Sequence, residues 1–201
     1  MKKIMFLAIM LYSTQVVLAQ VSGGIKGGIN LTNQKWEVEF QGDSDSEKYN
    51  GTGFHIGGYL TKSLSDVVTL QPELMFNVLK ADVEDEDFTM NYISLPIMLG
   101  YGVENNKLIL QAGPQLGVLL STDPEEMKED DAIKAIDFSF NFGGTINFDK
   151  LNLSVRYSLG LANLTGDALI DELEAFLGED IDLKIKNNNL QLSVGYKLFG
   201  K

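Results

Sequence analysis

The chain has 201 residues, with 28 acidic and 16 basic side chains, one histidine and no cysteine. A formal net charge of −12 argues against a nucleic-acid partner, because phosphates need a basic surface. The absence of cysteine excludes disulfides, thiolate metal sites and a lipidated cysteine anchor. A single histidine makes a histidine-based metal site hard to build. We therefore predict no metal site and no cofactor, in a chain long enough for one domain or two small ones.

Residues 1–19 predict a cleaved signal peptide. They begin with a basic start, continue with an apolar run over residues 4–11, and end with Val17 and Ala19 at the positions that a signal peptidase reads. The apolar run is too short for a membrane-spanning helix. We expect cleavage after Ala19, which leaves residues 20–201 as the mature domain.

Most of the remaining chain alternates between apolar and polar residues. From residue 136 to residue 148, nearly every even position is large and apolar, and every odd position is polar or glycine. This period of two indicates a β-strand with one apolar and one polar face. We predict eight strands, most of 9 to 13 residues, over residues 21–31, 54–60, 68–78, 93–101, 108–120, 136–148, 151–161 and 190–198.

The polar faces of these strands indicate which face is turned outward. They carry mainly serine, asparagine, glutamine and glycine, whereas a water-exposed sheet usually carries abundant lysine and glutamate. A soluble sandwich or a soluble ligand-binding barrel would turn the polar face outward, and a membrane barrel turns it inward. The composition favours the membrane barrel.

The connections between the strands alternate between short and long. For residues 20–201, we predict an outer-membrane β-barrel domain with an all-β fold. It is an eight-stranded antiparallel up-and-down transmembrane β-barrel with short periplasmic turns and long acidic extracellular loops. The long connections hold 23 of the 28 acidic residues. The short connections are residues 62–66, 104–106 and 149–150, and the long ones are residues 33–50, 80–88, 121–135 and 166–187.

Few charged residues fall on the strands. They occupy the same alternating positions as the small polar residues, so they belong to the polar face of each strand. We therefore expect them to project into the lumen and to form a connected charge network that blocks ion flow, because buried charges must pair. The interior of an eight-stranded barrel is about wide enough for side chains alone. The predicted network consists of Lys26, Glu73, Asp137, Arg156 and Lys197.

Three features of the sequence could serve catalysis or metal binding, and each also has a structural interpretation. His55 is the one candidate histidine acid or base, and a hydrogen-bonded lumen residue is the favoured interpretation. An activated Glu73 carboxylate is the alternative to a structural ion network. Acidic clusters at residues 43–47, 82–87 and 125–131 could ligate calcium, but a solvated rim is favoured.

Two of the long connections also carry helix signals. Asp123 followed by Pro124 and two glutamates is a favourable helix start. Residues 167–177 place Leu169, Leu173, Phe176 and Leu177 on one helical face, which we expect to pack on the barrel mouth or on a partner.

Six segments of the chain carry a resemblance to a known family: residues 24–31, 70–74, 92–97, 110–117, 156–161 and 190–199. Together they resemble the PorT-like outer-membrane β-barrel family of Bacteroidetes-type bacteria. The resemblance implies a barrel with periplasmic termini, and one named member of that family serves protein secretion. The last strand resembles the signal read by the barrel-assembly machinery at Gln191, Tyr196 and Leu198.

The leading hypothesis is a non-enzymatic outer-membrane protein with a structural or surface-binding role through its acidic loops. Its expected partners are outer-membrane lipid, the barrel-assembly machinery, and an extracellular or secretion-system protein. Two alternatives stay open: an accessory factor in protein secretion across the outer membrane, and a small membrane-embedded hydrolase that would depend on His55.

Overall fold

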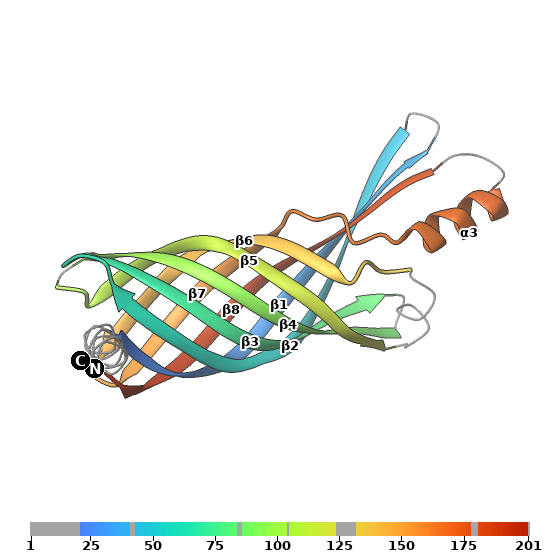
Figure 1. The fold of residues 1–201 in the computed structure, drawn as a ribbon. Helices are drawn as coiled ribbons and strands as arrows, with labels where there is room; N and C mark the ends of the chain where they lie inside the picture. Colours follow the sequence, from blue (N-terminus) through green and yellow to red (C-terminus); the bar gives the residue numbers. More distant parts are fainter. Residues whose placement is uncertain are drawn as a thin grey trace, which may run out of the picture.

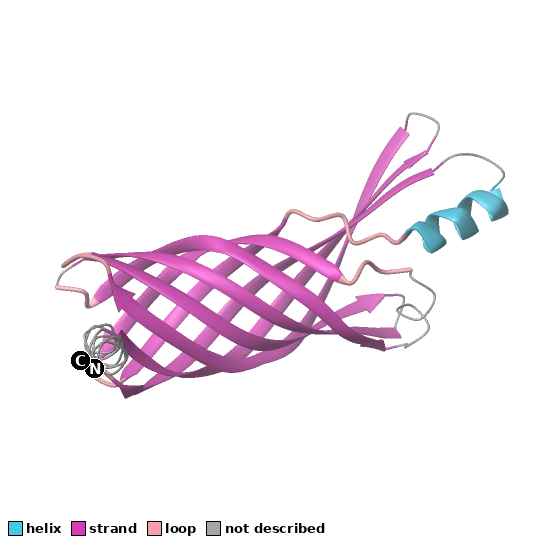
Figure 2. Ribbon diagram, in the orientation of Figure 1, coloured by secondary structure: helices cyan, strands magenta, loops and turns pink. Residues whose placement is uncertain are grey.

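The computed structural model describes residues 21–40, 43–83, 86–103, 105–123, 132–177 and 181–200. Eight antiparallel strands, each paired with the next along the chain, form one closed barrel in which β8 returns to pair with β1 (Figure 2). This confirms the predicted all-β, up-and-down barrel. The strands are β1 (Val21–Phe40), β2 (Asp43–Ser63), β3 (Val68–Val83), β4 (Glu86–Val103), β5 (Leu108–Asp123), β6 (Ile136–Phe148), β7 (Leu151–Gly160) and β8 (Ile181–Phe199).

The two faces of each strand differ in polarity, as the period of two predicts. On β7, the apolar side chains of Leu153 and Val155 are about half exposed, whereas Asn152, Ser154 and Arg156 are buried. The other strands repeat this arrangement around the barrel, with apolar side chains outside and polar side chains inside. It is the reverse of a soluble protein and suits a barrel surrounded by lipid.

Three tight turns lie at one end of the barrel, which we call the turn end. They connect β2 to β3, β4 to β5 and β6 to β7, where the sequence predicts short connections. Asn105, Asn106 and Asp149 in these turns have positive φ angles of 58°, 64° and 54°, a conformation that Asn and Asp adopt more readily than other non-glycine residues. Because Gly23 pairs with Phe199, β1 begins and β8 ends here too.

The opposite end, the loop end, departs from the prediction. Much of residues 33–50 and 181–187, expected to be loop, is strand, because β1, β2 and β8 continue far beyond their neighbours. The continuation projects past the barrel as a three-stranded sheet (Figure 1). We call this sheet the arm; it consists of residues 35–40 of β1, 43–48 of β2 and 181–186 of β8.

Alternation of apolar and charged residues explains why the arm is a sheet. Trp36 pairs with Ile185 across the β1–β8 ladder, and Glu37 pairs with Lys184. On β1 and β8, apolar side chains therefore share one face and charged side chains share the other. On β2, Asp45 and Glu47 pair with Val38 and Trp36 and lie on the apolar face. The high density of charge in these segments concealed the same period of two.

The helix predicted over residues 167–177 is present as α3 (Asp167–Leu177). The side chains of Phe176 and Leu177 lie outside the part that the structure describes, as does the helix start predicted at residues 124–126. In the described residues, no helix has the length and apolar character needed to cross a membrane. Three apolar side chains of α3 pack against an apolar cluster that includes Leu183 and Ile185 of β8: Leu169, Ile170 and Leu173.

An apolar cluster, the apolar plug, fills the loop end of the lumen and continues onto the base of the arm, where α3 packs against it. Hydrogen bonds from Lys134 N to Leu164 O (2.8 Å) and from Leu164 N to Ile185 O (2.9 Å) attach the connecting segments to β8. Met90, Leu164 and Ile185 are completely buried. The plug consists of Leu79, Phe88, Met90, Tyr92, Leu119, Ile133, Leu164, Leu183 and Ile185.

Leu164→Ala tests the plug. We expect it to lower the free energy of unfolding by about 2–5 kcal/mol, because a fully buried leucine is replaced and a cavity remains. The measurement is urea unfolding of the barrel in detergent micelles, followed by tryptophan fluorescence. Leu161→Ala is the matched control, because Leu161 is 50% exposed in the same connection; equal effects of the two variants would contradict the assignment.

Candidate functional site

Three of the five predicted lumen charges meet in one cluster, the ion cluster. The Glu73 carboxylate accepts a hydrogen bond from Lys26 Nζ at 3.1 Å. It also accepts two from the Arg156 guanidinium, with Nη1 2.8 Å from Oε2 and Nη2 2.7 Å from Oε1. The three side chains are 0–5% exposed and come from β1, β3 and β7, so the cluster crosses the lumen.

A fourth donor completes the environment of Glu73. Gln71 Nε2 lies 2.7 Å from Oε1, on the same face of β3 two residues earlier. The two-pronged arginine contact is the strongest kind of ion pair that side chains make. With four donors around one carboxylate, the cost of removing Glu73 from water is offset by direct interactions. The sequence did not single out Gln71, although its spacing from Glu73 is the available signal.

Asp137 and Lys197 do not join the ion cluster, so the prediction of a single network of five charges is wrong in this respect. Asp137 is buried near the loop end of β6, where Asn187 Nδ2 approaches its carboxylate at 3.5 Å. Lys197 lies near the end of β8, at the turn end, and lines a cavity there. The alternation of residues along a strand identifies the face on which a side chain lies, but not its height along the barrel axis. Asp137 and Lys197 lie at other heights than the ion cluster.

A second polar layer surrounds His55. Its Nδ1 lies 2.8 Å from Asn30 Oδ1, and its Nε2 lies 2.8 Å from Ser193 Oγ. The Asn30 amide nitrogen donates to the backbone carbonyls of Phe54 and Val78, so its oxygen faces the histidine. His55 Nδ1 therefore donates to Asn30, and Nε2 accepts the Ser193 hydroxyl proton.

Ser193 donates to His55, and His55 donates to Asn30, which is the direction of hydrogen bonding in a hydrolase triad. The surroundings argue for a structural role instead. His55 is 2% exposed and Ser193 is 7% exposed. Ser193 lies between Gly28 of β1 and Ser154 of β7 in the sheet, so its neighbouring backbone groups are engaged in strand pairing rather than directed at an oxyanion.

The acidic clusters give no metal centre in the described residues, where no group of three or more histidine or acidic side chains is placed to hold an ion. Residues 43–47 form part of β2, whose alternation sends neighbouring side chains to opposite faces. Residues 125–131 lie outside the described part of the chain, and residues 82–87 are described only in part.

Comparisons with known proteins agree with this architecture. The family model described as "Outer membrane protein beta-barrel domain" matches residues 15–166. No curated protein sequence matches the chain. Neisserial surface protein A is similar in structure, with a TM-score of 0.50 and 10% identity over 88% of this chain and 97% of that one. Ail of Yersinia pestis gives a TM-score of 0.44 and 13% identity over 89% of this chain and 99% of that one.

Arg156→Ala tests the ion cluster. We expect a loss of about 3–5 kcal/mol in the free energy of unfolding, because the Glu73 carboxylate keeps its burial and loses its main partner. Urea unfolding in micelles measures the loss. Lys134→Ala is the control, since its pair with Asp167 is exposed and separated by 3.6 Å, and exposed pairs contribute little. Similar midpoints for the two variants would refute a stabilising role for the cluster.

A fluorophosphonate probe tests the hydrolase alternative. Buried as it is, Ser193 should remain unlabelled in the folded barrel, at the background level of Ser193→Ala. Mass spectrometry of the probe-treated protein reads the result. Labelling that disappears in both Ser193→Ala and His55→Ala would instead identify an active hydrolase.

Proposed function

Because the chain belongs to the outer membrane protein β-barrel family, we propose that it is a non-enzymatic barrel that anchors an acidic binding surface in the outer membrane of a Gram-negative bacterium. The arm and the long loops form this surface, and the barrel holds them outside the cell. Its role is structural or in binding, and it is neither a pore nor an enzyme.

The filled lumen is the observation that carries this proposal. The ion cluster crosses the interior between β1, β3 and β7, and the apolar plug packs the loop end with completely buried side chains. An eight-stranded interior is narrow, so side chains at these two levels close it to a pore. The described surface at the loop end is the part that faces a macromolecular partner outside the cell.

The arm supports a binding role through its exposed charges. Asp45, Ser46 and Glu47 of β2 are exposed, as is the ion pair between Lys184 and Asp182 on β8 (2.6 Å). A hydrogen bond from Lys35 lowers the pKa of Glu37, so its carboxylate stays ionised. These groups offer acceptors and negative charge for a basic protein partner.

The proposal also covers the bacterial group, the signal peptide, the route of membrane insertion and a candidate secretion role. The PorT-like motifs support a place in the Bacteroidetes-type branch, with a signal peptide removed after Ala19 and insertion by the barrel-assembly machinery. The secretion accessory role is the second candidate, since a closed barrel with a protruding arm could dock on a secretion system. A deletion strain that secretes its cargo normally would exclude that role.

Single-cysteine variants test the orientation, and the natural chain has no cysteine to interfere. We expect a membrane-impermeant maleimide to label Ser46→Cys on the arm in intact cells. Asp66→Cys, in the β2–β3 turn, should react only after the outer membrane is permeabilised. Labelling of Asp66→Cys alone in intact cells would show the reverse orientation, and recovery of the protein in the soluble periplasm would exclude a membrane barrel.

Charge neutralisation tests the binding surface. Asp45→Asn combined with Glu47→Gln should reduce the partners recovered by crosslinking and pull-down from native membranes, because the arm loses two negative charges. Asp66→Asn, at the turn end, is the matched control and should recover the same partners as the unmodified protein. If the double variant recovers the same partners as the unmodified protein, the arm is not the binding surface.

A further inference from the structure

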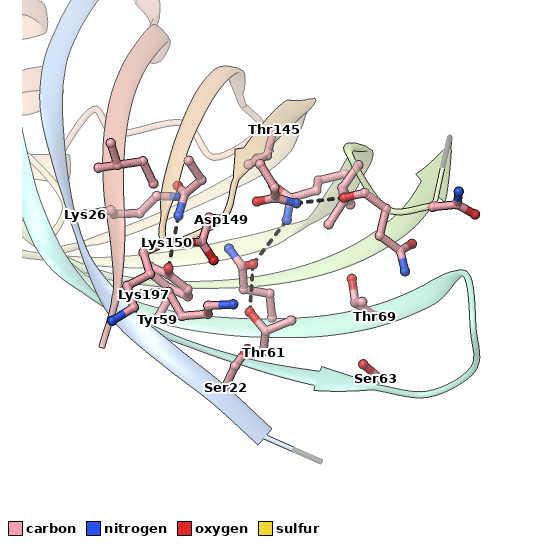
Figure 3. Close-up of a pocket in the computed structure, with 18 residues that line it drawn as sticks. Ser22, Lys26, Tyr59, Thr61, Ser63, Thr69, Thr145, Asp149, Lys150 and Lys197 are labelled. Atoms are coloured by element: carbon pink, nitrogen blue, oxygen red, sulfur yellow. Dashed lines mark hydrogen bonds between the residues drawn. The ribbon is translucent and has the colours of Figure 1, made fainter. Parts of the chain in front are cut away.

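The turn end of the lumen contains a cavity of about 380 Å³ that the functions considered so far do not use (Figure 3). Residues of β1, β2, β3, β5, β6, β7, β8 and two turns line it. At its inner end is Lys26, whose ammonium group binds Glu73 of the ion cluster. The cavity is therefore a vestibule that opens at the turn end and is closed inside. Its volume lies in the lower part of the range of small-molecule sites, about 300–1,000 Å³.

The wall of the vestibule is rich in amide and hydroxyl groups that are already oriented. Thr61 Oγ1 donates to Gln71 Oε1 at 3.0 Å, and Thr145 Oγ1 donates to Gln111 Oε1 at 3.0 Å. Asn152 Nδ2 donates to the Tyr59 hydroxyl at 3.0 Å. Pre-oriented donors and acceptors of this kind suit a ligand with several hydroxyl groups.

The vestibule also carries uncompensated positive charge. Lys150 comes from the β6–β7 turn and Lys197 from β8. In the described part of the chain, neither ammonium group has a carboxylate within ion-pair distance. Asp149 is the acidic residue in the lining, against three lysines. An anionic group would be attracted to this mouth.

We propose that the vestibule binds a small hydroxylated anion: a monosaccharide that carries a carboxylate or a phosphate. Its charged group lies between Lys150 and Lys197, and its hydroxyl groups bond to the amide and hydroxyl wall. The ion cluster closes the inner end, so the ligand is held and not conducted. Arrival from the periplasm rests on the orientation proposed above, but binding itself does not.

Calorimetric titration of the folded barrel in uncharged micelles tests this proposal with four probes: galacturonate, glucose 6-phosphate, glucose and sulfate. At least one charged sugar should bind, at least about tenfold more tightly than glucose or sulfate, a ratio that corresponds to about 1.4 kcal/mol. Tighter binding of galacturonate identifies a carboxylate site, and tighter binding of glucose 6-phosphate a phosphate site. Sulfate that binds as tightly as either sugar, or no binding by either charged sugar, would overturn the proposal.

Substitutions locate the site. Lys150→Gln and Lys197→Gln should each weaken binding of the charged sugar several-fold, and Thr61→Val should weaken it without changing the charge. Lys62→Gln is the matched control, because Lys62 is exposed near the same end but does not line the vestibule. An equal loss from Lys62→Gln would show attraction by surface charge alone. The mobility shift between folded and heated protein on gels confirms that each variant is folded.

Discussion

A strand surrounded by hydrocarbon has no water to bond its backbone, so every N–H and C=O group must find its partner within the chain. The pairing of β1 with β8 meets this requirement, because it removes the two edges that an open sheet would expose. Closure with eight strands also fixes a narrow interior. The apolar outer face, the polar lining and the need for each inward charge to find a partner all follow from that closure.

The inward side chains find their partners in different ways at different heights along the barrel axis. At the turn end, water and a small ligand can enter the vestibule. Next, Glu73 is neutralised by Lys26 and Arg156, with Gln71 as a further donor. Above these lies the neutral hydrogen-bonded layer of Asn30, His55 and Ser193, and above that the apolar plug. Charge pairing and apolar packing thus seal one short channel twice, which is why the proposed function treats the barrel as an anchor.

The arm follows a different constraint, because it extends beyond the rest of the barrel, where water can bond the free edges of a sheet. In the described residues, the outer part of β2 pairs with β1 alone. Exposed edges invite pairing with other chains, and charged side chains discourage it. Asp45 and Glu47 therefore keep the arm soluble and, in the proposed function, also give it a recognition surface. One end of the molecule thereby offers acidic groups and the other a basic vestibule.

The alternation of residues determined the number of strands, the face that each side chain occupies and the inward direction of the ion-cluster residues, because an extended backbone sends neighbours to opposite sides. Helical spacing likewise determined α3. The tertiary structure decided which inward residues meet. Glu73 contacts Arg156, 83 positions away, whereas Asp137, with the same kind of pattern, lies beside Asn187. Strand register and tilt set the height of each side chain, and these arise only when the barrel closes. The apolar plug, the arm and the vestibule depend on the same closure, since each is assembled from segments that are distant in the sequence.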